Sequence, residues 1–379
     1  MVFRCGEAIP ETINSYSPGQ ISPQYCKGEP MQTKKVVVPP MKSLIKKAPG
    51  FEKKKLADYK LDILALCGFG CRYCSSNMGN YLRINQQEFA ECSKTQTGKT
   101  TKPSEDPSLM MVWPDVVSQL ADELSSKPKH YGKDKTLMFS MLTDGFSPEL
   151  VKDGTTRAVL EMVLEKTSFR IRILTKNAIV GSDEWIQFLS DHKDRFIVGL
   201  STGSLDDAWC RKMELGTSSP TERFNALSRI QEAGVPTFGM LCPVFPDMLE
   251  GDSIERMIEL INPDVVEHIW AEPYNDRVNW RVVRSGYPIG SSTYEWFSNV
   301  YEYHMSPFWS FYATELYKRF RKHAVHNDWL PKLRYLLYED GIYESDASVY
   351  RGLHGVLLQS KPGIDGKSQN PFLADLQEI

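Results

Sequence analysis

The sequence predicts an α/β fold, a partial (β/α)6 TIM-like barrel with an N-terminal extension and a mainly helical C-terminal cap. From residue 57 to about 272, six short β-like apolar runs alternate with amphipathic stretches, which is the pattern of a parallel sheet wrapped by helices. Six strands are fewer than the eight that close a TIM barrel. Composition changes on both sides of this repeat, so three regions are expected: 1–56, 57–275 and 276–379.

The first region contains a basic arm. Residues 34–55 hold eight lysines and one glutamate among proline, glycine and serine, which favours an irregular segment that reaches the barrel near residue 57. Such an arm can contact phosphates, or it can be a solvated surface segment, and the sequence leaves both interpretations open.

The barrel elements follow from apolar runs bounded by polar or turn-forming residues. Strands are expected over 59–66, 136–142, 170–175, 196–201, 236–242 and 264–271, and helices near 113–126, 154–166, 183–191, 220–233 and 251–261. The polar, proline-containing stretch 92–108 is expected to form a loop. Because chemistry in such a barrel gathers at the carboxyl ends of the strands, the residues after each strand are the candidates for a site.

Three cysteines follow the first expected strand in the run LCGFGCRYC, at Cys67, Cys71 and Cys74. A C-x3-C-x2-C loop can place three thiolates at three corners of a [4Fe-4S] cube, and Gly68 and Gly70 suit a tight turn of the chain. A zinc site would need a fourth ligand at a short, regular spacing, and Cys92 is the nearest further thiol. Zinc, or three unrelated buried thiols, remain the alternatives.

Polar residues follow the next three expected strands in the same register. Thr143, Asp144 and Gly145 follow the second strand, Lys176 the third, and Ser201 the fourth. A lysine at a strand end can neutralise a carboxylate, and hydroxyls and exposed main chain can bond an amino acid or a ribose. Each of these segments is also ordinary turn chemistry, so the interpretation rests on their shared position.

The cysteine loop resembles the signature of the radical SAM superfamily, in which the open iron of the cluster chelates S-adenosylmethionine. Further segments resemble the spore photoproduct lyase-like branch of that superfamily: LTDGFSPE, ILTKN, GLSTG, Pro243-Val244-Phe245-Pro246 and Glu272-Pro273. The resemblance covers roughly residues 57–275. It implies a radical SAM barrel and an enzyme of lyase-like chemistry.

The resemblance also implies roles for individual residues. Thr143, Asp144 and Gly145 would hold the methionine amino group, Lys176 and Ser201 would contact the carboxylate and ribose, and Tyr73 and Val244 would lie near the adenine. Reductive cleavage of S-adenosylmethionine would then give methionine and a 5'-deoxyadenosyl radical that abstracts hydrogen from a substrate. The partner implied is a one-electron reductant of the flavodoxin or ferredoxin type.

Two departures from the branch concern the hydrogen atom that is returned to the product. Ser75 and Met141 stand where the resemblance implies a tyrosine and a cysteine. An alcohol O–H bond is too strong and a thioether has no S–H, so that relay is not expected here. Cys242 and Tyr274 are the candidate substitute donors, although each can equally be structural.

The mouth of the sixth expected strand and the region after it are the candidate substrate side. Glu272, Asn275 and Arg277 would lie between the cap and the cofactor. Residues 293–340 are rich in aromatic residues, with basic residues clustered at Lys318, Arg319, Arg321, Lys322 and His323. Such a mixture can stack bases and grip phosphates. Alternatively, helices over 294–304 and 309–326 pack their aromatic residues across the open side of the barrel.

Composition is typical of an intracellular enzyme. The 379 residues contain no apolar run near the roughly eighteen that cross a bilayer, and MVFRCGEAIPETINS lacks the order of a signal peptide, so a cytoplasmic protein without a membrane partner is expected. Eight cysteines with three clustered favour a reducing compartment over a disulfide framework. The net charge of −3 favours no class of partner.

Two functional hypotheses follow. The first is a radical SAM enzyme with a [4Fe-4S] cluster and S-adenosylmethionine, acting on a nucleic acid or nucleotide. The second is a nucleic-acid or protein-binding module with a structural Fe–S or zinc site. The sequence specifies neither the substrate nor the oligomeric state.

Overall fold

The computed structural model describes residues 33–74, 80–100, 106, 108–140, 142–276, 279–350 and 355–358. These residues belong to one compact unit that begins at Gln32, so the expected borders at 56 and 275 fall inside it. Ser75, Met141 and Arg277 lie outside the described residues. No helix among the described residues is long and apolar enough to cross a bilayer.

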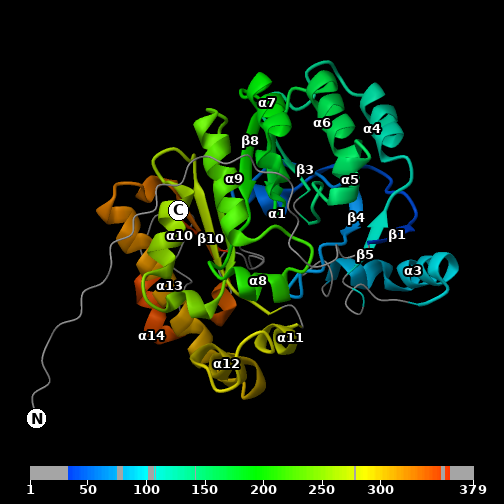
Figure 1. Cartoon of the computed structure of the whole chain (residues 1–379). Coiled ribbons are helices and arrows are strands. Elements are labelled where there is room, and N and C mark those ends of the chain that lie inside the picture. Colours follow the sequence, from blue (N-terminus) through cyan, green and yellow to red (C-terminus); the bar gives the residue numbers. More distant parts are fainter. Residues whose placement is uncertain are drawn as a thin grey trace, which may run out of the picture. The chain divides into compact units, whose positions relative to one another are not determined.

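A single series of parallel strands forms the barrel (Figure 1). In spatial order they are β3 (Tyr59–Leu61), β6 (Thr136–Phe139), β7 (Arg170–Thr175), β8 (Phe196–Leu200), β9 (Gly239–Val244), β10 (Ile269–Pro273), β11 (Leu333–Leu337) and β12 (Val356–Leu358). Two single bridges, Val198 to Thr237 and Ser201 to Met240, join β8 to β9. The α/β, partial TIM-like barrel is therefore confirmed.

The barrel extends further than predicted. Strands β11 and β12 come from the region that was expected to be mainly helical, and they add two parallel strands beyond β10. At the other edge β2 (Ile45–Lys47) pairs antiparallel with β3. The described strands end at β2 on one side and β12 on the other, which leaves the barrel open.

The first predicted strand, 59–66, is in fact two strands. After β3 the chain turns away at the buried Asp62, and β4 (Leu64–Cys67) pairs antiparallel with β5 (Leu109–Val112), which pairs in turn with β1 (Lys34–Val37). Asp62 accepts hydrogen bonds from the Leu142 N–H and the Thr143 hydroxyl, each at 3.3 Å. The cysteine loop thus begins on a small three-stranded sheet beside the barrel.

Helices pack against the outer faces of the strands. They are α3 (Asn80–Thr97), α4 (Val116–Ser125), α5 (Pro148–Lys152), α6 (Thr155–Lys166), α7 (Asp183–Asp191), α8 (Asp207–Met213), α9 (Pro220–Glu232) and α10 (Ser253–Ile261). Helix α9 begins with a capping box between Ser219 and Glu222. Helix α10 buries Ile254, Ile258 and Ile261, which share one helical face. The expected loop over 92–108 is wrong at its start, because α3 continues to Thr97.

The C-terminal region combines helices with the two added strands. Its helices are α11 (Trp280–Arg284), α12 (Ser292–Phe297), α13 (Ser306–His326) and α14 (Glu344–Ala347). Helix α13 packs against β10 and β11. This region therefore completes the sheet as well as covering it.

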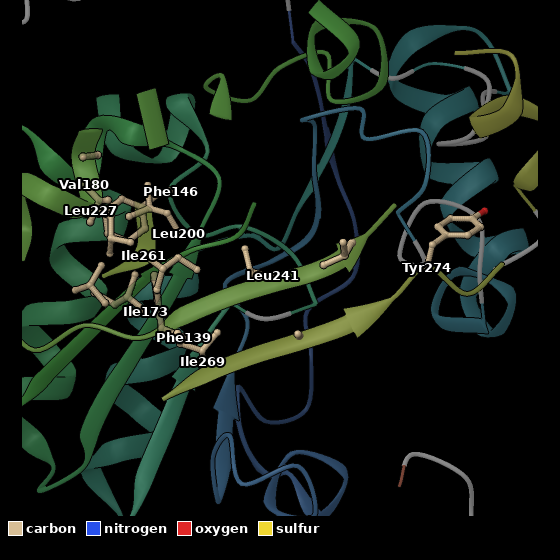
Figure 2. Packing of buried hydrophobic residues seen from close by; sticks show 14 of the residues in the cluster. Phe139, Phe146, Ile173, Val180, Leu200, Leu227, Leu241, Ile261, Ile269 and Tyr274 are labelled. Atoms are coloured by element: carbon tan, nitrogen blue, oxygen red, sulfur yellow. The ribbon is translucent and has the colours of Figure 1, made fainter. Parts of the chain in front are cut away.

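Two apolar clusters result from the period-two alternation of the strands. One lies between strands and helices, where Phe139, Ile173 and Ile269 meet helix residues such as Leu227 and Ile261 (Figure 2). The other fills the barrel interior and contains Met138, Ile197, Phe238, Met240, Trp270, Leu336 and Leu357. Residues two positions beyond these interior residues face the same side, toward the carboxyl ends of the strands.

Part of the basic arm enters the barrel core. Leu56 and Ala57 belong to the interior cluster, and the Lys54 carbonyl accepts a 2.9 Å hydrogen bond from the Trp270 indole. The Leu56 carbonyl accepts a hydrogen bond from Arg172. The described arm also contains β1, β2 and α1 (Pro49–Glu52), so the prediction of an irregular segment is wrong there.

Candidate functional site

The cysteine loop is tightly turned directly after β4. Cys67 is the last residue of that strand, and the Cys74 N–H donates to the Cys71 carbonyl at 3.0 Å. Gly68 and Gly70 have φ values of +71° and +64°, which side chains disfavour. A Cβ on Gly68 would also lie 3.1 Å from the Met110 Cβ. Glycine at these positions thus allows the turn that brings the cysteines together.

The three thiols lie close to one another and form no disulfide. Burial raises the pKa of Cys67 to about 12, and the nearby Cys74 and Asp144 charges raise it further. Burial and the Glu214 charge raise the pKa of Cys71 well above its usual value. Since thiolates are the metal ligands, the site would release protons on binding a metal.

The donor set fits a cluster with separate irons. Within the described ranges, no three Cys, His, Asp or Glu side chains converge as a single metal ion requires. A [4Fe-4S] cube instead takes each thiolate at a different iron, so its ligands are spread around the cube. Three thiols on one loop are chemically suited to that arrangement.

A second segment of chain, 213–216, braces the cysteine loop. The Arg72 N–H donates to the Met213 carbonyl at 2.8 Å, and the Gly216 N–H donates to the Phe69 carbonyl at 2.8 Å. Between these bonds, Cys71 and Glu214 form an antiparallel β-bridge. A Cβ on Gly216 would lie 3.2 Å from the Phe69 Cα, so glycine permits the close approach.

Glu214 is the centre of a buried polar network. Its side chain accepts hydrogen bonds from the Arg223 guanidinium and the Tyr73 hydroxyl, and its Oε1 lies 3.3 Å from the Lys176 Nζ. Burial alone would raise the pKa of Glu214, but the Arg223 and Lys176 charges outweigh it and lower the pKa to about 2. Glu214 is therefore a stable anion at neutral pH.

Lys176 and Ser201 meet at the ends of β7 and β8. The Lys176 Nζ donates to the Ser201 Oγ at 3.0 Å and lies 5.5 Å from the centre of the Tyr73 ring. Arg223, which is completely buried, donates to the Ser201 carbonyl at 2.7 Å. The structure thus brings together residues that the sequence placed in separate motifs.

The Thr143–Gly145 turn is fixed by its own hydrogen bonds. Asp144 accepts from the Thr175 hydroxyl and the Lys176 N–H, each at 2.8 Å, and burial raises its pKa to about 6. Gly145 is packed so closely that a Cβ would lie 2.5 Å from the Ser140 Oγ. Two residues on, the Ser147 hydroxyl donates to the Cys67 carbonyl at 2.9 Å. This turn and the cysteine loop are therefore in direct contact.

Strand β9 closes the next side of the site. The Ser201 hydroxyl donates to the Cys242 carbonyl at 3.2 Å. The Val244 carbonyl accepts hydrogen bonds from the Tyr274 N–H and the Tyr312 hydroxyl. The Tyr73 ring packs edge-on against Phe245, with 5.2 Å between ring centres. Tyr73 and Val244 are thus neighbours through Phe245.

Glu272 and Cys242 face the barrel interior. They lie two residues beyond Trp270 and Met240 of the interior cluster, and both are only partly buried. The Tyr338 hydroxyl, two residues beyond interior Leu336, donates to Glu272. Burial, and then the Glu272 charge, raise the pKa of the Cys242 thiol. These three side chains form a group beside the Lys176 network.

Tyr274 lies in a packed environment instead. Only 1% of its surface is exposed, its hydroxyl donates to Asn279 at 3.0 Å, and its ring stacks on Phe245. Figure 2 shows its ring apart from the labelled strand and helix residues of the core. Asn275 is partly exposed next to it.

The basic cluster on α13 is divided by the helix. Arg319 pairs with Glu255, and His323 accepts from the Trp329 indole at 3.0 Å. An open hollow of about 700 Å³ is lined by Tyr317, Lys318, Arg321, Lys322, Val325, His326 and Val349. The Trp309, Tyr312 and Phe320 rings are buried, which agrees with the interpretation of the aromatic residues as core.

Glu214, Arg223 and Tyr338 were not predicted as site residues. One signal was available, because Arg223 shares the buried face of α9 with Leu227 and Ile230. A charged residue on an apolar helical face needs a buried partner. The identity of that partner depends on the fold.

No protein-family model matches the chain. A protein described as "Uncharacterized protein ORF301", from Acidianus two-tailed virus, is 24% identical over 160 residues, which are 41% of this chain and 52% of the viral protein. The matched part therefore spans about half the length of that relative.

Solved structures similar to this chain include a mutant of spore photoproduct lyase, with a TM-score of 0.42, 15% identity, and coverage of 71% of this chain and 72% of that one. Spore photoproduct lyase complexed with dinucleoside spore photoproduct has a TM-score of 0.41 and 17% identity, over 68% of each chain. The protein anSMEcpe with bound AdoMet has a TM-score of 0.35 and 13% identity, over 56% of this chain and 50% of that one. Structures of the family that the sequence motifs resemble are thus among those similar to this chain.

Proposed function

We propose that the protein is a radical SAM enzyme, lyase-like in type, that holds a [4Fe-4S] cluster on Cys67, Cys71 and Cys74 and binds S-adenosylmethionine beside it. One observation carries this proposal: the three-thiol loop directly contacts the polar strand ends. The contacts are Ser147 to Cys67, and Tyr73 to Glu214 and Lys176. A binding module with a structural metal would have no need of this polar surface beside its thiols.

Each polar group suits one part of S-adenosylmethionine. The Lys176 ammonium would bind the carboxylate, Ser201 the ribose, and the Thr143–Gly145 turn the amino group, while Tyr73 and Val244 would flank the adenine. When bound, the cluster and S-adenosylmethionine would supply a 5'-deoxyadenosyl radical for hydrogen abstraction. The residues of the chain would bind and orient the ligand and exclude water from it.

The substrate side is proposed to be the group around Glu272. Glu272 and Cys242 face the interior beside the Lys176 network, and Asn275 and Arg277 follow in the sequence. A nucleic acid or nucleotide is the proposed substrate class, and a flavodoxin-type or ferredoxin-type protein in the cytoplasm is the proposed reductant. The partly buried Cys242 is a better placed hydrogen donor than the packed Tyr274.

The experiment is anaerobic reconstitution with iron and sulfide, followed by reduction and addition of S-adenosylmethionine. We expect 5'-deoxyadenosine from wild-type protein and its loss in Cys71→Ala. Cys92→Ala, a thiol on α3 outside the loop, is the matched control and should retain activity. Short DNA or RNA carrying ultraviolet lesions should raise the yield if it contains the substrate.

The alternative is a nucleic-acid or protein-binding module with a structural Fe–S or zinc site. The basic hollow on α13 is the observation that favours it. Zinc in place of iron, no cleavage of S-adenosylmethionine, and full nucleic-acid binding by Lys176→Ala would support the module and contradict the enzyme.

A further inference from the structure

Glu214 contacts the cysteine loop and the end of β7 at the same time. Its main chain forms the bridge to Cys71, while its carboxylate reaches Tyr73 of the loop and Lys176 after β7. The exposed fraction of Glu214 is 3%, so these contacts are shielded from water. Any displacement of this carboxylate would therefore be felt on both sides.

The two carboxylate oxygens have different partners. Oε2 accepts from Arg223, whereas Oε1 accepts from the Tyr73 hydroxyl and faces the Lys176 ammonium at 3.3 Å. Two cations thus contact one anion. Lys176 is held in place without being fully neutralised, because Arg223 already balances the Glu214 charge.

Arg223 fixes the position of this carboxylate. Besides Glu214 it donates to the Ser218 carbonyl at 2.8 Å, the Ser201 carbonyl at 2.7 Å and the Thr217 hydroxyl at 3.0 Å. A planar guanidinium with this many partners has one orientation. Glu214 is therefore attached to the barrel through a rigid group.

The other acid of the site does not compete for Lys176. Asp144 turns its carboxylate to the Thr175 hydroxyl and to the N–H groups of Lys176 and Phe146. The Lys176 ammonium is instead placed by Glu214 and by Ser201, whose hydroxyl lies 3.0 Å away.

We infer that Glu214 is a positioning residue, which holds the Lys176 ammonium and Tyr73 where the carboxylate of S-adenosylmethionine is received, and that Arg223 fixes Glu214. This role rests on the proposed function. It makes Glu214 act through Lys176, with no direct contact to the ligand required.

Two ligands distinguish positioning of Lys176 from a general defect. S-Adenosylmethionine carries the amino-acid carboxylate, and 5'-methylthioadenosine lacks it. The test variant is Glu214→Gln with Arg223→Gln, which removes both buried charges together and leaves no unpaired ion. The Kd of each ligand is measured by anaerobic equilibrium dialysis of reconstituted protein, with iron content and circular dichroism as checks on the fold.

We expect the affinity for S-adenosylmethionine to fall about tenfold, as for the loss of one charge-assisted hydrogen bond, and that for 5'-methylthioadenosine to stay unchanged. Lys176→Ala should cost less affinity in this variant than in wild type, because the ammonium is already misplaced. If the variant takes up no iron, Glu214→Asp, which keeps the charge and withdraws it by one methylene, provides the same comparison.

Equal losses for both ligands, an unchanged affinity for S-adenosylmethionine, or strictly additive effects with Lys176→Ala would overturn the positioning role. Wild-type protein that takes up iron but binds no S-adenosylmethionine would overturn the proposed function, and this role with it. The two failures are therefore distinguishable.

Discussion

The buried Glu214 carboxylate makes stability depend on pH. Its pKa of about 2 in the folded protein is below its ordinary value, because Arg223 and Lys176 outweigh the effect of burial. A depressed acid pKa stabilises the fold above the unfolded pKa, and this contribution is lost as pH falls through the folded one. A shift of this size corresponds to about 3 kcal/mol at neutral pH.

We therefore expect the urea midpoint of wild type to fall more steeply between about pH 4.5 and pH 2 than that of Glu214→Gln with Arg223→Gln. Other carboxylates titrate in both proteins, so the difference between the two curves isolates this pair. Parallel curves across that range would show that the pair does not carry the effect.

Gly203 lies where strand β9 approaches most closely. A Cβ at this position would lie 1.7 Å from the Pro243 carbonyl oxygen, which belongs to main chain and cannot rotate away. Gly203→Ala should lower the melting temperature by several degrees and weaken the contact between Ser201 and Cys242. Gly50→Ala, with no atom within 4 Å of the new Cβ, is the control. Equal melting temperatures for the two variants would contradict this packing.

At the scale of elements, local patterns predicted what lies within one segment. Strand β7 has the predicted bounds, and α6 and α7 match the predicted ranges, because their apolar periodicity is local. The break in 59–66 was not predicted, although Asp62 interrupts that apolar run. Strands β11 and β12 were missed because strand formation depends on pairing with distant partners such as β10.

The candidate site was predictable to the same extent. The position after each strand was enough to group Asp144, Lys176 and Ser201, since parallel strands end at one edge. Glu214 was not predicted as a site residue, because nothing in the sequence pairs it with the Lys176 ammonium. That contact depends on α8 and α9 folding back over the barrel.

The N-terminal arm gives a prediction about an element. Leu56 is completely buried in the interior cluster, far in sequence from most of its neighbours. Leu56→Ala should cost about 2–5 kcal/mol of stability, as for other large-to-small changes in a core. The exposed Leu260 of α10 is the matched control, and Leu260→Ala should cost much less. Thermal unfolding compares them, and similar melting temperatures would show that the arm is not part of the core.

At the scale of the whole molecule, the barrel separates two kinds of chemistry around one opening. Lys176 and Ser201, at the ends of β7 and β8, lie beside the cysteine loop with Glu214 and Arg223. Glu272 and Tyr338 come from the other side, from β10 and the segment after β11. The cationic side suits the carboxylate of S-adenosylmethionine, and the acidic side remains for a substrate.

This separation predicts that defects on the two sides are independent. Lys176→Ala should weaken binding of S-adenosylmethionine by about tenfold or more, because the carboxylate loses its counter-charge. Glu272→Gln keeps the size of the side chain and lies outside that network, so the Kd for S-adenosylmethionine should stay as in wild type. Any loss in Glu272→Gln should appear only in the substrate-dependent yield of 5'-deoxyadenosine. If Glu272→Gln weakens S-adenosylmethionine as much as Lys176→Ala does, the two sides act as one ligand site, and the substrate must bind elsewhere on the protein.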